Sequence, residues 1–282
     1  VKENQKEGRE IPGFFLLAIS VRGFPFLGRE KQVMNTKPSF VSVVHALSNL
    51  SDEELVAVAE KPELLKQFAS KILADNVANT YVVALSDDEA IKLLVENKKY
   101  NKKRAKAVVA KWRKYAAGLG YTGPVAWKAK DGFTLKSHAP LAGPCYKKLD
   151  DLQSWNIRND EATKNAIVFW VPRLVEGSTN NTISQMETIR EQFRQRYDLP
   201  DHHAISFGST ALLFALILAH FKRTGERVPY KYYYATSDAF RVDGFRLIAG
   251  GFQENGLRCY FWGRDAHGNI GFFLLGVEEL GQ

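Results

Sequence analysis

One segment limits the folds open to this chain more than any other. Residues 207–221 are apolar almost all round, and Gly225 follows them at a position typical of a helix C-cap. A helix without a polar face has to be enclosed by protein. The run also falls short of the ~20 apolar residues that a membrane span requires. We therefore expect a buried helix inside a folded domain and no transmembrane segment.

The chain after this helix has the pattern of a β-sheet. Four runs rich in aromatic and β-branched residues are separated by turn signals such as Asp243-Gly244 and Asn255-Gly256. They predict a four-stranded antiparallel meander packed on the buried helix, which makes the fold α+β. Three shorter β runs come earlier, at 80–85, 166–171 and 204–207. The four runs of the meander cover residues 230–236, 245–252, 257–263 and 270–277.

The N-terminal part is predicted to be mainly helical. Ser86 begins a capping box with Glu89, so a helix is expected from there to about Asn97. Asn101 is a typical N-cap for a second helix that ends at Gly118. Residues 1–120 are therefore interpreted as a mainly helical domain with a small strand element. The earlier elements expected in it are one or two strands within 14–26 and helices at 39–50, 52–60 and 63–74.

A stretch rich in glycine and proline follows this part. Between Gly118 and Pro144 there are eight such residues, whereas the whole chain has 21 glycines and 10 prolines. Because both residue types interrupt regular structure, residues 121–163 are predicted to be a linker or a long irregular crossing. Residues 164–282 are then predicted to form the α+β domain with the antiparallel sheet. Within this domain a polar helix is expected at 184–197, before the sheet.

Positive charge is concentrated in one place. The 282 residues include 39 Lys+Arg and 31 Asp+Glu, a net charge of +8, and eleven of the cations lie within 97–130, where no acid occurs. On a helix of residues 97–117, apolar side chains gather in one arc and the cations occupy the rest. Like charges without acids weaken an isolated helix, and a polyanion relieves the repulsion by releasing its counterions. The predicted contact residues are Lys98, Lys99, Lys102, Lys103, Arg104, Lys106, Lys111, Arg113 and Lys114.

We therefore expect a polyanion-binding protein, with nucleic acid as the first candidate partner. Contacts between lysine and phosphate give affinity without sequence information, so low sequence specificity is expected. Two alternatives stay open, a helix face that is merely solvated and a face that docks an acidic protein. An anionic membrane surface is less consistent with the sequence, because the apolar side of the helix is mostly Val and Ala, which suits packing against protein.

A second, smaller hint of nucleic-acid binding lies in the C-terminal sheet. Arg258, Tyr260 and Trp262 alternate along one run, so they are predicted to share one face of a strand. Aromatic side chains next to arginine can stack nucleobases. Core packing is the simpler alternative, because the run 270–277 is apolar on both faces.

The segment 201–210 supports a different hypothesis, an enzyme of the hydrolase or phosphate-ligand type. His202 and His203 could supply a general base beside Ser206, with Asp201 orienting an imidazole. The segment lacks the glycines of a Walker A loop and of a nucleophile elbow. N-capping of the following helix by a serine is the simpler interpretation.

Neither a metal nor a cofactor is expected. Adjacent residues point in different directions, so His202 and His203 are not expected to serve one ligand set, and the histidine spacing matches no common zinc pattern. Only two cysteines occur, without the spacing of a disulfide scaffold or zinc ribbon, and Cys145 is interpreted as loop packing rather than a nucleophile. This cysteine usage indicates a cytoplasmic protein. Since the chain begins at Val1, removal of a leader stays open.

Overall fold

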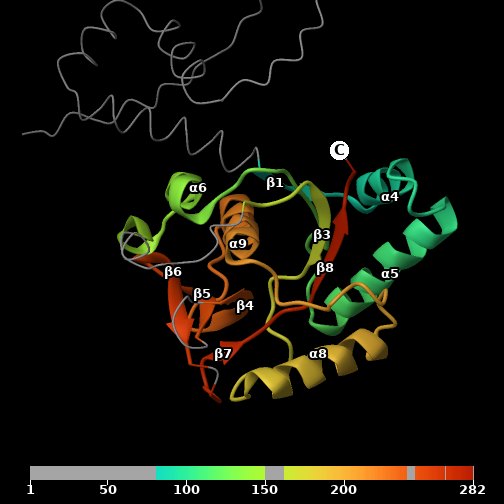
Figure 1. Cartoon of the computed structure of the whole chain (residues 1–282). Helices are drawn as coiled ribbons and strands as arrows, with labels where there is room; N and C mark the ends of the chain where they lie inside the picture. Colours follow the sequence, from blue (N-terminus) through green and yellow to red (C-terminus); the bar gives the residue numbers. More distant parts are fainter. Residues whose placement is uncertain (1–80, 150–161, 240–244, 264, 282) are drawn as a thin grey trace, which may run out of the picture. The chain divides into compact units, whose positions relative to one another are not determined.

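The computed structural model describes residues 81–149, 162–239, 245–263 and 265–281. The strands expected within 14–26 and the helices expected within 39–74 lie outside these residues. The described residues form two four-stranded sheets with helices packed around them, as Figure 1 shows. The α+β class predicted from the sequence is confirmed.

The first sheet is antiparallel throughout, in the order β1-β2-β3-β8. All five residues of β3 are buried, so both faces of this sheet are covered by other elements. That matches the sequence of β3, which is apolar on both faces and therefore requires two covers. The strands are β1 (Val82–Leu85), β2 (Ala126–Ala129), β3 (Ala166–Trp170) and β8 (Leu275–Glu279).

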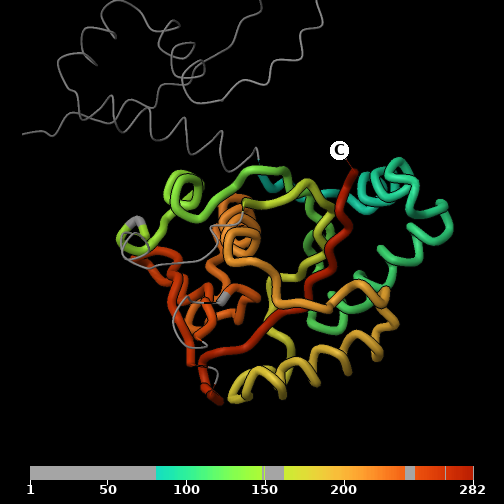
Figure 2. The backbone as a smooth tube through the Cα atoms, viewed as in Figure 1, coloured from blue at the N-terminus to red at the C-terminus, as the bar shows by residue number. Residues whose placement is uncertain are grey.

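The second sheet has the order β6-β5-β4-β7. Its first three strands form the antiparallel meander that the sequence predicts, but β7 pairs with β4 in parallel. The fourth predicted run, 270–277, is split between β7 and β8, which lie in different sheets. The physical reason is its apolar character on both faces: residues Phe272, Phe273 and Leu274 are buried as the chain crosses from one sheet to the other (Figure 2). The strands are β4 (Tyr233–Ala239), β5 (Arg246–Gln253), β6 (Gly256–Trp262) and β7 (Ile270–Gly271).

Helix α9 (Thr210–Thr224) is the buried helix that the apolar run predicts, and it lies between the two sheets (Figure 1). It contacts β1 of the first sheet and both β4 and β5 of the second. The helix begins after Ser209 as N-cap and ends at Gly225, which takes the left-handed conformation expected of a C-cap. None of the helices described has both the length and the apolar character that crossing a membrane requires.

The other face of the first sheet is covered by α4 (Asp87–Glu96) and α5 (Lys102–Gly118). The predicted capping box of Ser86 and the predicted N-cap Asn101 are both present. The predicted polar helix is α8 (Ile183–Arg196), with Thr182 as its N-cap. The apolar arc of α5 packs inward, with Trp112 stacked on Phe169 of β3 at 5.6 Å between ring centroids. The buried residues of α5 are Ala105, Val108, Val109, Trp112, Tyr115 and Ala116.

Two segments differ from the sequence prediction. The segment 121–163, predicted as a linker or crossing, contains the inner strand β2, the helix α6 (Leu135–Ala142) and the 3₁₀ turn η1 (Tyr146–Leu149). Pro140 lies inside α6, and the glycines of the segment lie outside these short elements. The first sheet thus joins strands from all three predicted segments of the chain. The run 204–207 is a loop rather than a strand, because Ala204 takes a positive φ of 53°.

Replacing Ser209 by Ala is expected to lower the free energy of unfolding by about 1 kcal/mol, because the side chain caps α9. Its Oγ accepts a hydrogen bond from the Leu212 backbone N–H at 3.2 Å. Ser206 makes no hydrogen bond among the described residues, so Ser206→Ala is the matched control and should change stability much less. Urea unfolding of both variants checks the expectation. Equal losses for the two variants would contradict it.

Candidate functional site

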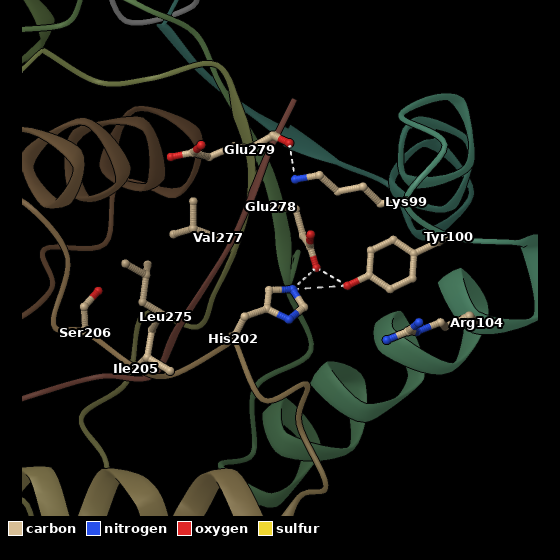
Figure 3. Close-up of a pocket in the computed structure, with 10 residues that line it drawn as sticks. All are labelled: Lys99, Tyr100, Arg104, His202, Ile205, Ser206, Leu275, Val277, Glu278 and Glu279. Carbon is tan, nitrogen blue, oxygen red and sulfur yellow. Dashed lines mark hydrogen bonds and ion pairs between the residues drawn. The ribbon is translucent and has the colours of Figure 1, made fainter. Parts of the chain in front are cut away.

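A pocket of about 540 Å³ opens where α5, the loop after α8 and strand β8 meet (Figure 3). Its wall combines two cations, two carboxylates, a histidine, a tyrosine and a serine. Its lining residues are Lys99, Tyr100, Arg104, His202, Ile205, Ser206, Leu275, Val277, Glu278 and Glu279.

Backbone hydrogen bonds between separate elements hold the functional side chains at the pocket. Glu278 lies on β8, where it is paired in register with Ile167 of β3. The loop that carries His202 and His203 is tied to the same strand, because the Ala204 N–H donates to the Leu275 carbonyl at 2.8 Å. Tyr100 directly precedes the N-cap of α5. The sheet, the loop and the helix therefore converge on one point.

That point is the carboxylate of Glu278. Its Oε1 accepts hydrogen bonds from His202 Nε2 at 2.7 Å, from His203 Nε2 at 2.9 Å and from the Tyr100 hydroxyl. The side chain is 2% exposed. Burial alone would raise the pKa of Glu278, but the hydrogen bonds from His203, Tyr100 and His202 outweigh it and hold the pKa at about 2. Glu278 is therefore a buried carboxylate that stays charged.

His203 is a fixed, neutral donor in this cluster. The indole Nε1–H of Trp112 donates to its Nδ1 at 3.0 Å, and because an indole nitrogen can only donate, Nδ1 must be the unprotonated nitrogen. The proton of a neutral ring then lies on Nε2, the atom that faces Glu278. Burial lowers the pKa of His203, although the hydrogen bond to Glu278 opposes this effect. The ring is completely buried and packs against Phe169 as well as Trp112.

His202 differs from its neighbour in exposure. Its side chain is 47% exposed, and its Nε2 faces Glu278 and the Tyr100 hydroxyl. Figure 3 shows its other ring nitrogen, Nδ1, turned away from Glu278. No hydrogen bond to Nδ1 occurs among the described residues. If Nε2 donates to the carboxylate, Nδ1 carries a lone pair at the pocket, which is the arrangement of a general base held by a carboxylate.

The sequence argument that adjacent histidines point apart does not hold here. Both rings reach one oxygen atom, with their centroids 4.6 Å apart, because the chain turns sharply in this loop instead of alternating as in a strand. The ligand atoms of His202, His203 and Glu278 lie within 4.8 Å of one another, which is close enough to hold a metal ion. Binding through His203 Nε2 would require a lone pair on the atom that carries the proton. The hydrogen bond from Trp112 therefore favours a proton network over a metal centre, and the expectation of no metal stays a prediction.

The cations predicted on the basic helix fall into two groups. Lys111 and Arg113 have structural partners: Lys111 pairs with Asp198 at 2.7 Å, and the Arg113 guanidinium binds Asp87 through two nitrogens. Lys102, Lys103 and Lys106 are exposed and form no hydrogen bond or ion pair among the described residues. The structure places Lys98 and Lys114 at the surface as well.

Two further cations of this set line the pocket. Lys99 Nζ donates to the backbone carbonyl of Glu279 at 2.9 Å. The guanidinium carbon of Arg104 lies 5.2 Å from the centroid of the Tyr100 ring, a cation–π contact. Figure 3 shows both side chains bordering the same pocket as His202. Arg104 therefore links the pocket to the exposed face of α5, since it belongs to the first turn of that helix.

The predicted aromatic row on β6 is not formed as expected. Trp262 is 6% exposed and donates its indole N–H to the Asp265 carbonyl at 2.8 Å, so it belongs to the core. The guanidinium carbon of Arg258 lies 4.2 Å from the centroid of the Tyr146 ring. Tyr260 and its neighbour Phe261 are both about half exposed, which breaks the alternation. The three predicted residues do not form one exposed surface for stacking bases.

The remaining sequence candidates take other positions. The carboxylate of Asp201 is fully exposed and pairs with Arg194 at 2.6 Å, so it does not orient an imidazole. Ser206 lines the pocket but forms no hydrogen bond with a histidine among the described residues. The thiol of Cys145 donates to the Ala139 carbonyl, and burial raises its pKa to about 12, which leaves it protonated at neutral pH.

Glu278, Tyr100 and Trp112 are the site residues that the sequence did not indicate as such. Their partners lie far away along the chain, and no local motif surrounds them. Comparison of the chain with family models, curated proteins and solved structures finds no match in any of the three. The function is therefore inferred from the chemistry of the site itself.

Replacing Gly276 by Ala is expected to disturb the histidine cluster. A Cβ at this position of β8 would lie 2.7 Å from His203 Nδ1 and 2.8 Å from Trp112 Cζ2, so both rings would have to shift. We expect a loss of roughly 1–3 kcal/mol in the free energy of unfolding, measured by urea denaturation. Gly268→Ala is the control, because a Cβ there meets nothing within 4 Å. If the two variants are equally stable, the packing described for His203 is incorrect.

Replacing Glu278 by Gln is expected to remove part of the acid sensitivity of the fold. The unfolded chain takes up this proton near pH 4.5, whereas the folded chain resists until about pH 2. Glu278 thus contributes up to about 3 kcal/mol to the free energy of unfolding above pH 4.5. This contribution is lost as the pH falls from 4.5 towards 2.

Urea unfolding of wild type and Glu278→Gln at pH 7, 5, 4 and 3 measures this difference. His203 also resists protonation in the folded state, so its contribution to stability falls as the pH drops below about 6.5, and wild type and variant both retain this histidine. The slope of stability against pH below 4.5 should therefore be steeper in wild type. Parallel slopes in that range would show that Glu278 is not a buried, charged acceptor.

Proposed function

We propose that the protein binds nucleic acid, with low sequence specificity, through the outer face of α5. The observation that carries this proposal is the set of Lys102, Lys103 and Lys106, which are exposed together and have no acidic partner among the described residues. Lys102 and Lys106 are four residues apart on one helix, so they repel each other. A polyanion would turn this repulsion into binding, because phosphates that contact the lysines release their own counterions.

The position of these cations within the helix supports a role in binding. Lys102, Lys103 and Arg104 occupy the first turn of α5, which contains no acid. The N-terminal end of a helix carries partial positive charge from its free N–H groups, so cations there reduce stability by several tenths of a kcal/mol each. Helix α4 shows the opposite arrangement, with Asp87, Asp88 and Glu89 in its first turn.

The packing of α5 supports the same proposal. The apolar arc of the helix is buried against β3, and Arg113 anchors it to α4 through Asp87. The helix is held rigidly, so the lysines are presented as a fixed surface rather than on a mobile tail. Such a surface can follow a phosphate backbone without ordering costs in the protein main chain. Because lysine contacts phosphate and not base edges, discrimination among sequences should be weak.

Reversing the charge of the three lysines, as Lys102→Glu, Lys103→Glu and Lys106→Glu together, should weaken nucleic-acid binding by at least about tenfold near 100 mM salt. The slope of log affinity against log salt should become less steep by roughly 2–3, about one unit for each phosphate that no longer meets a lysine. Fluorescence anisotropy with labelled single-stranded and duplex DNA and RNA measures both quantities.

A matched control carries the same change in net charge elsewhere. Lys130, Arg223 and Lys231 are exposed on three other parts of the chain, and their joint reversal to Glu should leave the salt slope almost unchanged. Equal losses in both triple variants would mean that net charge alone attracts the ligand. If the wild type binds an acidic polypeptide but none of the four nucleic acids, the surface docks an acidic protein and the proposal is wrong.

A further inference from the structure

The pocket beside α5 contains a base that the binding function does not require. Glu278 fixes the Nε2 side of His202, and the half-exposed ring presents Nδ1 on the other side. A buried carboxylate that holds an accessible imidazole keeps it in one orientation and one tautomer, and stabilises the imidazolium formed after proton uptake. His202 is therefore placed as a general base.

The groups that support His202 make this arrangement rigid. Tyr100 and His203 donate to the same oxygen of Glu278, and Trp112 fixes the tautomer of His203. A glutamate with only a packing role in the core would not need three hydrogen-bond donors on one oxygen. His203 and Trp112 do not line the pocket, so they are positioning residues for His202, whereas Tyr100 both lines the pocket and donates to the carboxylate.

The same pocket is suited to a phosphate group. Lys99 and Arg104 supply two cations to the lining of the pocket, to which His202 also belongs (Figure 3). Two acids line the pocket. Glu278 accepts hydrogen bonds from its three donors, and the Glu279 carboxylate lies 4.0 Å from the Lys164 Nζ, measured from Oε1. The volume of about 540 Å³ falls within the range of sites that hold a nucleotide-sized ligand.

We infer that this pocket cleaves RNA, with His202 as the general base, an inference that rests on the proposed nucleic-acid binding. A single histidine base with two cations is suited to an attack by a hydroxyl group that the substrate itself supplies. In RNA the 2′-hydroxyl lies next to the phosphodiester, so the nucleophile is already in place and only its proton has to be removed. DNA lacks this hydroxyl and would be bound without being cleaved.

The proposed step conserves atoms and charge. His202 Nδ1 takes the proton of the 2′-hydroxyl, and the 2′-oxygen forms a bond to phosphorus. The bond from phosphorus to the 5′-oxygen of the next nucleotide breaks, and that oxygen takes a proton from water. The products are a 2′,3′-cyclic phosphate and a 5′-hydroxyl end, and His202 returns its proton to solvent. Arg104 and Lys99 stabilise the negative charge that develops on the phosphate oxygens.

The first experiment uses the full chain and a dinucleotide of RNA, which contains one cleavable bond and is small enough to occupy the pocket without spanning the outer face of α5. Chromatography follows the 2′,3′-cyclic phosphate. His202→Ala should reduce the rate at least about 100-fold, the usual contribution of a general base. His267→Ala is the matched control, because that histidine is also exposed but lies outside the pocket. Equal cleavage by wild type and His202→Ala, or none by wild type, overturns the inference.

A second measurement separates this inference from the binding proposal. Affinity is measured on a longer RNA in which every 2′-hydroxyl is replaced by a 2′-methoxy group, so that it cannot react. His202→Ala should bind it within about threefold of wild type, whereas the triple reversal at Lys102, Lys103 and Lys106 should bind it poorly. Binding without cleavage of the dinucleotide or of unmodified RNA leaves the proposed function standing and refutes the catalytic role. Absence of binding by the wild type refutes both.

The pH profile tests the positioning role of Glu278. The charged and titratable groups around His202 are Glu278, Glu279, His203, Tyr100, Arg104 and Lys99. A general base acts only in its unprotonated form, so cleavage should rise with pH. Glu278→Gln should move the midpoint of this rise to lower pH, because a neutral amide no longer favours the imidazolium. A variant that is slower but has an unmoved midpoint would show that Glu278 acts only on the structure.

Discussion

A carboxylate withdrawn from water needs hydrogen-bond donors, and the arrangement of the described residues meets this need at Glu278. The donors come from the residue before α5 and from the loop after α8, while the acceptor lies on β8. Segments that are distant along the chain are thereby fixed to one atom. Trp112 extends the network into the core, and the missing side chain of Gly276 gives its ring and that of His203 the room they occupy. The pocket is a consequence of this arrangement, since it lies where the three segments separate towards solvent.

The charges of the molecule are divided between two environments. Negative charge at Glu278 is buried and stabilised by hydrogen-bond donors, whereas Lys102, Lys103 and Lys106 of α5 are exposed to solvent. An anion that approaches therefore meets lysine and arginine first, and the hidden carboxylate acts on it only through His202. The rigid attachment of α5 to the first sheet keeps this order of contacts fixed. The proposed binding and the proposed proton transfer would thus use neighbouring surfaces without opposing each other.

Features with a local physical cause were predictable from the sequence, and features that depend on distant partners were not. The caps Ser86, Asn101 and Gly225 and the buried side of α5 follow from the positions of a few neighbouring residues, and the structure confirms them. The strand β2 was missed, because four residues between glycines and prolines carry too little pattern to reveal an inner strand.

The same distinction explains the site. His202, His203, Arg104 and Lys99 were identified as candidates from their residue types alone, but their grouping was not. The carboxylate partner is Glu278 rather than the neighbouring Asp201, since the loop turns the rings towards β8 and leaves Asp201 in solvent. The separation of β7 from β8 could not be predicted either, because an apolar run is compatible with both sheets. Pairing across long distances in the chain is what the sequence alone could not supply.

The position of β8 has a consequence for the order in which the protein forms. The ribosome makes Tyr100, Trp112 and both histidines of the cluster before it makes Glu278. Until β8 pairs with β3, the first sheet lacks an edge strand and the cluster lacks its acceptor. The cluster and the pocket are therefore complete only after this strand has paired.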